Sequence, residues 1–361
     1  MPDAPSILQN GPNASSFITT LDGESTALIK LKNQNGISVA LTNYGARIVS
    51  IKMPDKSGNI ADIVLGYDSI DKYLSSKNPY FGATIGRFAN RIAKGHIQIN
   101  NQSYQLDVNA PPHHLHGGAD GFHSRIWSLQ SESSSEAVMN LNSHAGDSGY
   151  PGNLNIKVTY DLNNENELSI QYEAISDAST VINLTNHAYF NLNGAGSGSV
   201  GDHLVYIDAD QFTPVNQHLI PIGLPSEVKN TPFDFTVEKR IDQHWDNNEY
   251  EQIYFAEGFD HNYVLNKNSS NQLKLAAKVT DPSSGRVLEV ETTEPGLQFY
   301  TANAMNSKDV GREGKPYFAR SAFCLETQHF PDSPNHDSFP SVILEAGETY
   351  KSTTIYRFKY Q

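Results

Sequence analysis

The residues best suited to chemistry in this chain are a histidine and a glutamate, each set beside apolar residues. His187 lies in NLTNHAYFNL, and Glu326 lies in CLETQHF directly after an apolar run. An ionisable side chain in such a segment costs free energy unless it is paired, so both are candidates for a functional site. Each also has a structural interpretation, since His187 could be a hydrogen-bonded core residue and Glu326 a carboxylate at a strand edge. As a pair, they would supply a general acid and a general base, which suits a reaction that only moves protons.

A second group of histidines lies in the segment PPHHLHGG, which contains His113, His114 and His116. His114 and His116 are spaced like two metal ligands on a strand, but no glutamate follows, and a first-row metal usually needs three protein ligands. We therefore expect His113 and His114 to be solvated loop residues, and we predict no metal site. The pair Gly117-Gly118 predicts a tight turn that leaves His116 at the edge of a cleft.

Two further charged side chains have both a structural and a functional interpretation. Asp260, in GFDHNYVL, is either a turn residue or a ligand for a hydroxyl group. Arg91, in GRFANRIAKG, is either a surface ion-pair partner or a hydrogen-bonding fork for a polar ligand. The chain contains no G-x-S-x-G motif, no Walker lysine motif and no G-x-G-x-x-G after a strand. The residues therefore indicate no nucleophile and no cofactor.

The elements that would position these residues are mostly β-strands. Apolar and polar residues alternate on both sides of a turn in 97–108, and again in 154–172. Each of these units predicts an antiparallel hairpin with one buried face. Helical periodicity is limited to SIDKYL near residue 70, and GAGSGSVG (194–201) predicts a loop. We predict an all-β fold, one large antiparallel β-sandwich with few short helices.

Length and composition limit the class of protein. The 361 residues are 38% hydrophobic and 18% charged, without an uncharged apolar stretch long enough to span a membrane. A net charge of −14 would repel nucleic acid, and the single cysteine, Cys324, excludes an internal disulfide. We expect a loose N-terminal segment over residues 1–16 with no features of a secretory signal, followed by one domain over 17–361. We expect a cytoplasmic protein, either a monomer or a homodimer.

Several longer segments resemble those of the aldose 1-epimerases, also called galactose mutarotases. They include YFGATIGRFANRIAKG, HHLHGG, NLTNHAYFNLNG, GFDHNYVL, EPGLQFYT and FCLETQHFPDSPNH, which occur in the family's order and at its spacing. The similarity runs from about Ile37 to the C-terminus. The chain differs at Asp147-Ser148, where the family often has an acidic pair, and at Ala302, where glycine is common.

The resemblance implies a β-sandwich of the galactose mutarotase type that holds a small aldose in an open cleft. It implies that Glu326 is the general base and His187 the general acid. Six further residues would contact the sugar hydroxyls: Asn90, Arg91, His116, Tyr189, Asp260 and Gln298. The implied reaction interconverts the α and β anomers of free hexoses such as galactose and glucose by ring opening and closure, without a cofactor. A nearby carboxylate is expected to favour the charged form of His187.

Three other interpretations remain open from the sequence. The first is a non-catalytic sugar-binding module on the same scaffold, which the presence of both proton carriers disfavours. The second is an epimerase of hexose 6-phosphates, which would need more basic residues than Arg87 and Arg91, the main ones in the matched segments. The third is a jelly-roll metalloenzyme that uses the histidines of PPHHLHGG.

Overall fold

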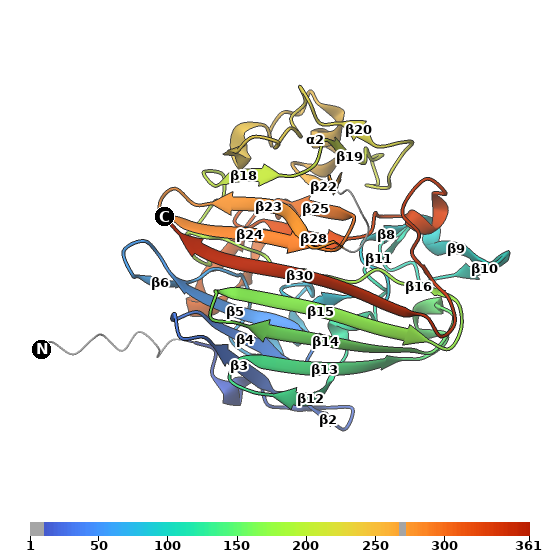
Figure 1. The fold of residues 1–361 in the computed structure, drawn as a ribbon, viewed down its shortest axis with the longest axis horizontal. Helices are drawn as coiled ribbons and strands as arrows, with labels where there is room; N and C mark the ends of the chain where they lie inside the picture. The colour runs from blue at the N-terminus through green and yellow to red at the C-terminus, as the bar shows by residue number, and fades with distance from the viewer. Residues whose placement is uncertain (1–10, 267–271) are drawn as a thin grey trace, which may run out of the picture.

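Antiparallel β-sheets make up most of the computed structural model, which describes residues 11–266 and 272–361. The largest sheet has nine strands in the order β12-β13-β14-β15-β30-β24-β23-β18-β21. Figure 1 shows this order from β12 to β18. Its strands are β12 (Ser128–Glu132), β13 (Glu136–Ser143), β14 (Leu154–Leu162), β15 (Glu167–Ser176), β18 (Leu204–Ile207), β21 (Lys239–Arg240), β23 (Lys274–Thr280), β24 (Arg286–Thr292) and β30 (Thr349–Tyr360). In β14 every second residue is buried, because successive side chains point to opposite faces of a sheet.

Two smaller sheets complete the main layers, with strand orders β3-β4-β5-β6 and β20-β19-β22-β25-β28. Their strands are β3 (Leu28–Lys32), β4 (Ser38–Thr42), β5 (Arg47–Pro54), β6 (Ile60–Asp62), β19 (Gln211–Phe212), β20 (Ser226–Glu227), β22 (Asp260–Val264), β25 (Gly296–Tyr300) and β28 (Cys324–Gln328). One apolar core contains side chains from all three sheets, among them Val158 of β14, Ile51 of β5 and Phe299 of β25. The sheets therefore pack face to face as a sandwich.

Short ladders and single helical turns connect these layers. The two-stranded ladders pair β1 (Thr20–Leu21) with β2 (Glu24–Ser25), β7 (Thr84–Ile85) with β17 (Thr185–Asn186), β8 (Arg91–Ile92) with β11 (His114–Leu115), β9 (His96–Ile99) with β10 (Gln102–Gln105), β16 (Thr180–Val181) with β29 (Ile343–Leu344), and β26 (Asn306–Val310) with β27 (Pro316–Phe318). The helices are α1 (Ile70–Ser75), α2 (Glu251–Ala256) and the 3-10 turns η1 (Ala14–Phe17), η2 (Ala93–Gly95), η3 (Phe122–Ser124), η4 (Asp147–Gly149), η5 (Ile241–Gln243), η6 (Arg312–Gly314) and η7 (Ser333–Asn335). Within the described ranges, no helix has the length and apolar character needed to cross a membrane.

The predicted all-β sandwich with few short helices is confirmed. The hairpin predicted in 97–108 is β9–β10, the one in 154–172 is β14–β15, and 194–201 contains neither strand nor helix. Of the predicted loose segment 1–16, residues 1–10 lie outside the described residues, and residues 14–16 belong to η1. One apolar core joins strands from all three sheets, as a single domain requires. The domain boundaries at residues 17 and 361 stay a prediction.

Candidate active site

A cleft of about 1060 Å³ contains nearly all of the candidate site residues. Seven of the eight residues singled out by the resemblance line it: Asn90, Arg91, His116, His187, Tyr189, Asp260 and Glu326. The eighth, Gln298, lies next to the cleft, and its Nε2 donates a hydrogen bond of 2.7 Å to Oδ1 of Asp260. The structure therefore brings together side chains that are far apart in the sequence.

Glu326 lies in the middle of β28, directly opposite Gln298 of the neighbouring strand β25. The residue is only 2% exposed, and Oε2 of its carboxylate is a buried atom without a hydrogen-bond partner among the described residues. Burial raises the pKa of Glu326 well above its ordinary value; Asp260 raises it further, and Arg91 lowers it. The strand thus presents a carboxyl group that resists ionisation.

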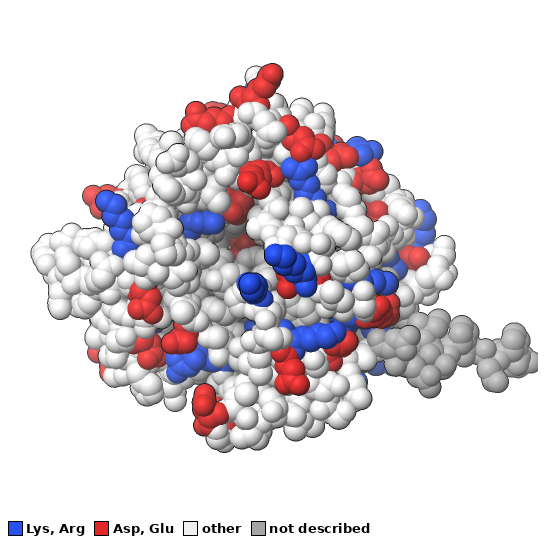
Figure 2. Space-filling view, turned by 180° about the vertical axis from the view of Figure 1, so that it is seen from behind, with Lys and Arg blue, Asp and Glu red and all other residues white. Residues whose placement is uncertain are grey.

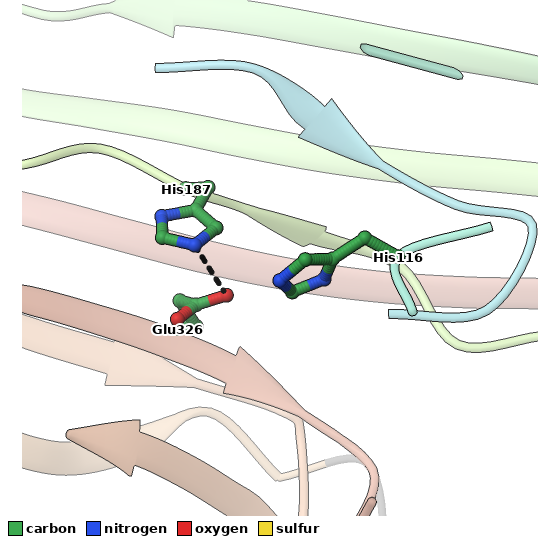
Figure 3. Close-up of side chains that lie close together, drawn as sticks. All are labelled: His116, His187 and Glu326. Atoms are coloured by element: carbon green, nitrogen blue, oxygen red, sulfur yellow. Dashed lines mark ion pairs between the residues drawn. The ribbon is translucent and has the colours of Figure 1, made fainter. Parts of the chain in front are cut away.

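His187 follows β17, and the turn before β7 holds its backbone. The Gly82 N–H donates to the His187 carbonyl oxygen, and the His187 N–H donates to the Ala83 carbonyl oxygen, both at 2.9 Å. Nε2 of His187 lies 3.6 Å from Oε2 of Glu326 (Figure 3). Burial lowers the pKa of His187 to about 3. The expectation that the nearby carboxylate favours the charged form of His187 is therefore wrong for the free site, because burial lowers the pKa of His187 and also favours the uncharged form of Glu326.

The backbone turn after β11 directs His116 into the cleft. His116 has a φ of 52°, and Gly117, with a φ of 84°, has no room for a side chain, since a Cβ would lie 1.8 Å from the Gly86 carbonyl oxygen. The predicted tight turn is confirmed. The Asn90 N–H donates to Nδ1 of His116 at 3.1 Å. A neutral His116 ring consequently carries its proton on Nε2.

A polar network at the cleft joins Arg91, Asp260 and Gln298. Nη2 of Arg91 lies 3.8 Å from Oδ2 of Asp260, while Gln298 holds the other oxygen of the same carboxylate. The side chains of Arg91 and Asp260 are 20% and 15% exposed, so both remain accessible from the cleft. The arrangement offers a guanidinium donor and a carboxylate acceptor to a polar ligand.

His116, His187 and Glu326 point toward one another (Figure 3). One ligand atom from each lies within 4.8 Å of the other two, and these residue types bind divalent metals. His116 fits a metal poorly in this arrangement, because Nδ1 accepts the Asn90 N–H and Nε2 carries the ring proton. The expectation of no metal site stays a prediction.

His113 and His114 are buried, so the expectation that they are solvated loop residues is wrong. His114 is 0% exposed; its ring nitrogens lie 2.6 Å from the Tyr150 hydroxyl and 2.7 Å from the Asp107 carbonyl oxygen. Nδ1 of His113 accepts a hydrogen bond of 3.0 Å from the Lys94 N–H. Hydrogen bonds to both ring nitrogens compensate for the burial of His114, whereas Nε2 of His113 is buried without a partner among the described residues.

Arg87, one of the two main basic residues of the matched segments, has a structural role. It is buried, and Nη1 donates to the carbonyl oxygens of Pro151 and Gly152 at 2.7 and 3.0 Å. Its donors therefore hold a loop rather than face the cleft.

Two aromatic residues of the cleft, Tyr80 and Tyr300, had no expected role. The His187 ring is stacked with Tyr80 and lies at 90° to Tyr300. Tyr80 falls in the matched segment YFGATIGRFANRIAKG, and this position could have indicated a residue of the site. Aromatic residues in such segments are, however, usually core residues.

An open cleft on a β-sandwich, with a buried imidazole and carboxyl group facing each other, is the arrangement of an acid–base enzyme. Comparison with known proteins agrees with that class. Residues 27–357 match the model of the aldose 1-epimerase family. The galactose mutarotase of Rattus norvegicus is 41% identical over 322 residues, which cover 89% of this chain and 91% of that protein. The aldose 1-epimerase of Haemophilus influenzae is 36% identical over 341 residues, covering 94% and 97%.

Two solved structures share the fold over nearly their whole length. The aldose epimerase homologue of C. elegans has a TM-score of 0.86 at 30% identity, covering 93% of this chain and 99% of that chain. The galactose 1-epimerase of Lactobacillus acidophilus has a TM-score of 0.82 at 30% identity, covering 95% and 97%. The chain belongs to the aldose 1-epimerase family.

Proposed function

We propose that this protein interconverts the α and β anomers of free hexoses, galactose and glucose among them, by acid–base catalysis alone. The observation that carries the proposal is the buried pair of Glu326 and His187, whose carboxyl oxygen and ring nitrogen are 3.6 Å apart in a cleft large enough for a sugar. Family membership gives the reaction class, and the names of the relatives suggest the substrates.

Anomers exchange through the open-chain aldehyde, and this requires two proton transfers. The Glu326 carboxylate takes the proton of the C1 hydroxyl, and the His187 imidazolium gives a proton to the ring oxygen, so the C1–O5 bond breaks. The aldehyde rotates about the C1–C2 bond. His187 then takes the proton back from O5 as that oxygen attacks C1, and Glu326 returns a proton to O1. Each positioned proton-transfer group typically contributes a factor of about 10² to 10⁴ in rate.

The pair carries one proton throughout this cycle. With a cyclic sugar the proton is on His187, and with the open-chain sugar it is on Glu326. Burial raises the pKa of Glu326 and lowers that of His187, so the free site favours the second arrangement. The proton must therefore move from Glu326 to His187 before the sugar ring opens, and ring opening returns it to the arrangement that the free site favours.

The other cleft residues would hold the ring so that C1 faces Glu326. His116 offers an Nε2–H donor because of its hydrogen bond from Asn90, while Arg91 and Asp260 offer a donor and an acceptor to the same cleft. Gln298 would act mainly through Asp260, whose carboxylate it orients. In this proposal Asn90 and Tyr189 also contact the sugar.

We also propose that the enzyme needs no cofactor and binds neither nucleic acid nor a membrane. On the face in Figure 2, acidic and basic side chains are interspersed, which suits a neutral ligand. A single cysteine and a net charge of −14 are consistent with a cytoplasmic protein. We propose a monomer or a homodimer, which sedimentation equilibrium would distinguish.

Polarimetry of freshly dissolved α-galactose and α-glucose tests the function directly. The protein should speed the approach to the equilibrium rotation for at least one of these sugars, and EDTA should leave the rate unchanged. An observed rate equal to that of buffer for both sugars would contradict the proposed function. A rate lost with EDTA and restored by a metal would contradict only its independence from a cofactor.

A further inference from the structure

The Tyr80 ring contacts three imidazole rings around the candidate site. Its centroid lies 5.8 Å from that of His187, 4.7 Å from that of His116 and 4.9 Å from that of His123. The Tyr80 ring is within 9° of parallel to His187 and meets the other two rings at 61° and 64°. Tyr80 therefore packs against the proposed proton donor and against a histidine proposed to bind the sugar.

The backbone also connects Tyr80 to His187. Tyr80 lies in the turn before β7, where its carbonyl oxygen accepts the Ala83 N–H at 3.0 Å. The same turn exchanges two hydrogen bonds with the main chain of His187, through Gly82 and Ala83. One turn thus fixes the His187 backbone and places an aromatic ring beside its side chain.

A second tyrosine supports the same ring. Tyr189 is stacked with His187 at a centroid distance of 4.8 Å and an interplanar angle of 9°. Two parallel aromatic neighbours restrict rotation of the imidazole plane, while its Nε2 edge faces Glu326. The faces of aromatic rings also attract cations, which favours an imidazolium in a site where burial disfavours it.

We propose that Tyr80 is a positioning residue for the proton transfer: its ring fixes the plane of His187 and stabilises the imidazolium form that gives its proton to the ring oxygen. The proposal rests on the proposed function, because Tyr80 itself exchanges no proton with the sugar. The effect of Tyr80 on the rate must therefore pass through His187.

Three single variants test this role by polarimetry at saturating and limiting sugar. Tyr80→Leu should lower kcat about tenfold and change KM less than about threefold, because it removes the ring beside the proton donor. Tyr80→Phe should recover most of that loss, since it keeps the ring and lacks only the hydroxyl. Tyr254→Leu is the control for loss of an aromatic ring elsewhere, because Tyr254 lies in α2 and is 63% exposed. This control should match the wild-type protein.

A double-mutant cycle distinguishes action through His187 from a separate effect on the sugar. In a His187→Asn background, Tyr80→Leu should lower the residual rate less than about twofold. An undiminished tenfold loss in that background, or a loss confined to KM, would overturn the proposal. If the leucine variant fails to fold, Tyr80→Met takes its place, because methionine is also apolar, is similar in volume to leucine and lacks an aromatic ring. The same loss of kcat is then expected.

Nuclear magnetic resonance supplies a readout that does not depend on activity. The ring current of Tyr80 should displace the His187 ring-proton signals, and the displacement should persist in Tyr80→Phe and change in Tyr80→Leu. Identical His187 signals in all three proteins would contradict the contact. A wild-type protein that shows this displacement but does not catalyse anomer exchange would refute the proposed function and leave the ring contact established.

Discussion

Two imidazole–carboxylate pairs each include a residue in or directly after β28, and they differ in how completely they are paired. His329 follows β28, and its Nδ1 lies 2.6 Å from Oε2 of Glu294, whose other oxygen accepts the Tyr350 hydroxyl at 3.0 Å. His187 and Glu326 are 3.6 Å apart, and the facing oxygen of Glu326 has no hydrogen-bond partner among the described residues. We call His329 and Glu294 the closed pair, because hydrogen bonds within the protein hold the carboxylate. We call His187 and Glu326 the open pair, because it has polar atoms available for a ligand.

Burial and residue type alone do not identify a functional pair in this protein. The side chains of Glu294 and Glu326 are each 3% exposed, and each carboxylate has an imidazole nearby. Unpaired buried polar groups cost stability, so a protein keeps them where they serve a purpose. The cleft beside Glu326 is consistent with such a purpose.

Replacing the carboxylate of the open pair should have the largest effect. Glu326→Gln keeps the shape of the side chain but cannot take a proton from the C1 hydroxyl, so kcat should fall about 10³-fold. Sugar binding, measured by equilibrium dialysis, should change far less than kcat. A polarimetric rate near that of the wild type would remove Glu326 from the role of base.

The same variant should become more stable at neutral pH. The pKa of Glu326 is raised in the folded protein, so the folded state binds more protons than the unfolded state at a pH above the ordinary pKa of the group. The free energy of unfolding therefore falls as the pH rises from the ordinary pKa of glutamate to the raised pKa of Glu326. Because Glu326→Gln removes this cost, its free energy of unfolding in urea at pH 7 should be higher than that of the wild type, and a lower value would contradict this account.

Removal of the imidazole of the open pair should have the next largest effect. His187→Asn should lower kcat about 10²-fold, because ring opening then lacks its proton donor, and KM should change less. Initial rates over a range of galactose concentrations separate the two constants. A change in KM alone would make His187 a binding residue and not an acid.

The closed pair should respond in stability and not in catalysis. His329→Gln removes the ion pair and leaves the Glu294 carboxylate buried, which should cost about 1–3 kcal/mol of the free energy of unfolding. The kcat of the folded variant should stay within about threefold of the wild-type value. Urea unfolding, followed by tryptophan fluorescence, measures the first quantity and polarimetry the second. A large loss of kcat without loss of stability would erase the distinction between the two pairs.

The sequence predicted the strands and most of the lining of the cleft, because period-two alternation and long matched segments can both be recognised in one sequence without knowledge of the tertiary structure. It did not predict the burial of His114, since burial depended on a distant partner, Tyr150. Nor did it predict the protonation preference of His187, because the cost of burial depends on the layers that cover the ring. The role proposed for Tyr80 depends on ring distances across three segments, and no local pattern encodes these.

The smallest expected effect is the change of rate with pH, and it follows from the open pair alone. Proton transfer requires one proton on the pair. As the pH falls, a second proton binds only near the lowered pKa of His187, about 3; as the pH rises, the single proton leaves only at the raised pKa of Glu326. Therefore kcat/KM should change less than about twofold from about pH 5 up to the raised pKa of Glu326, after correction for the buffer-catalysed rate. A one-proton bend near the ordinary pKa of histidine would instead indicate that His187 titrates independently of Glu326.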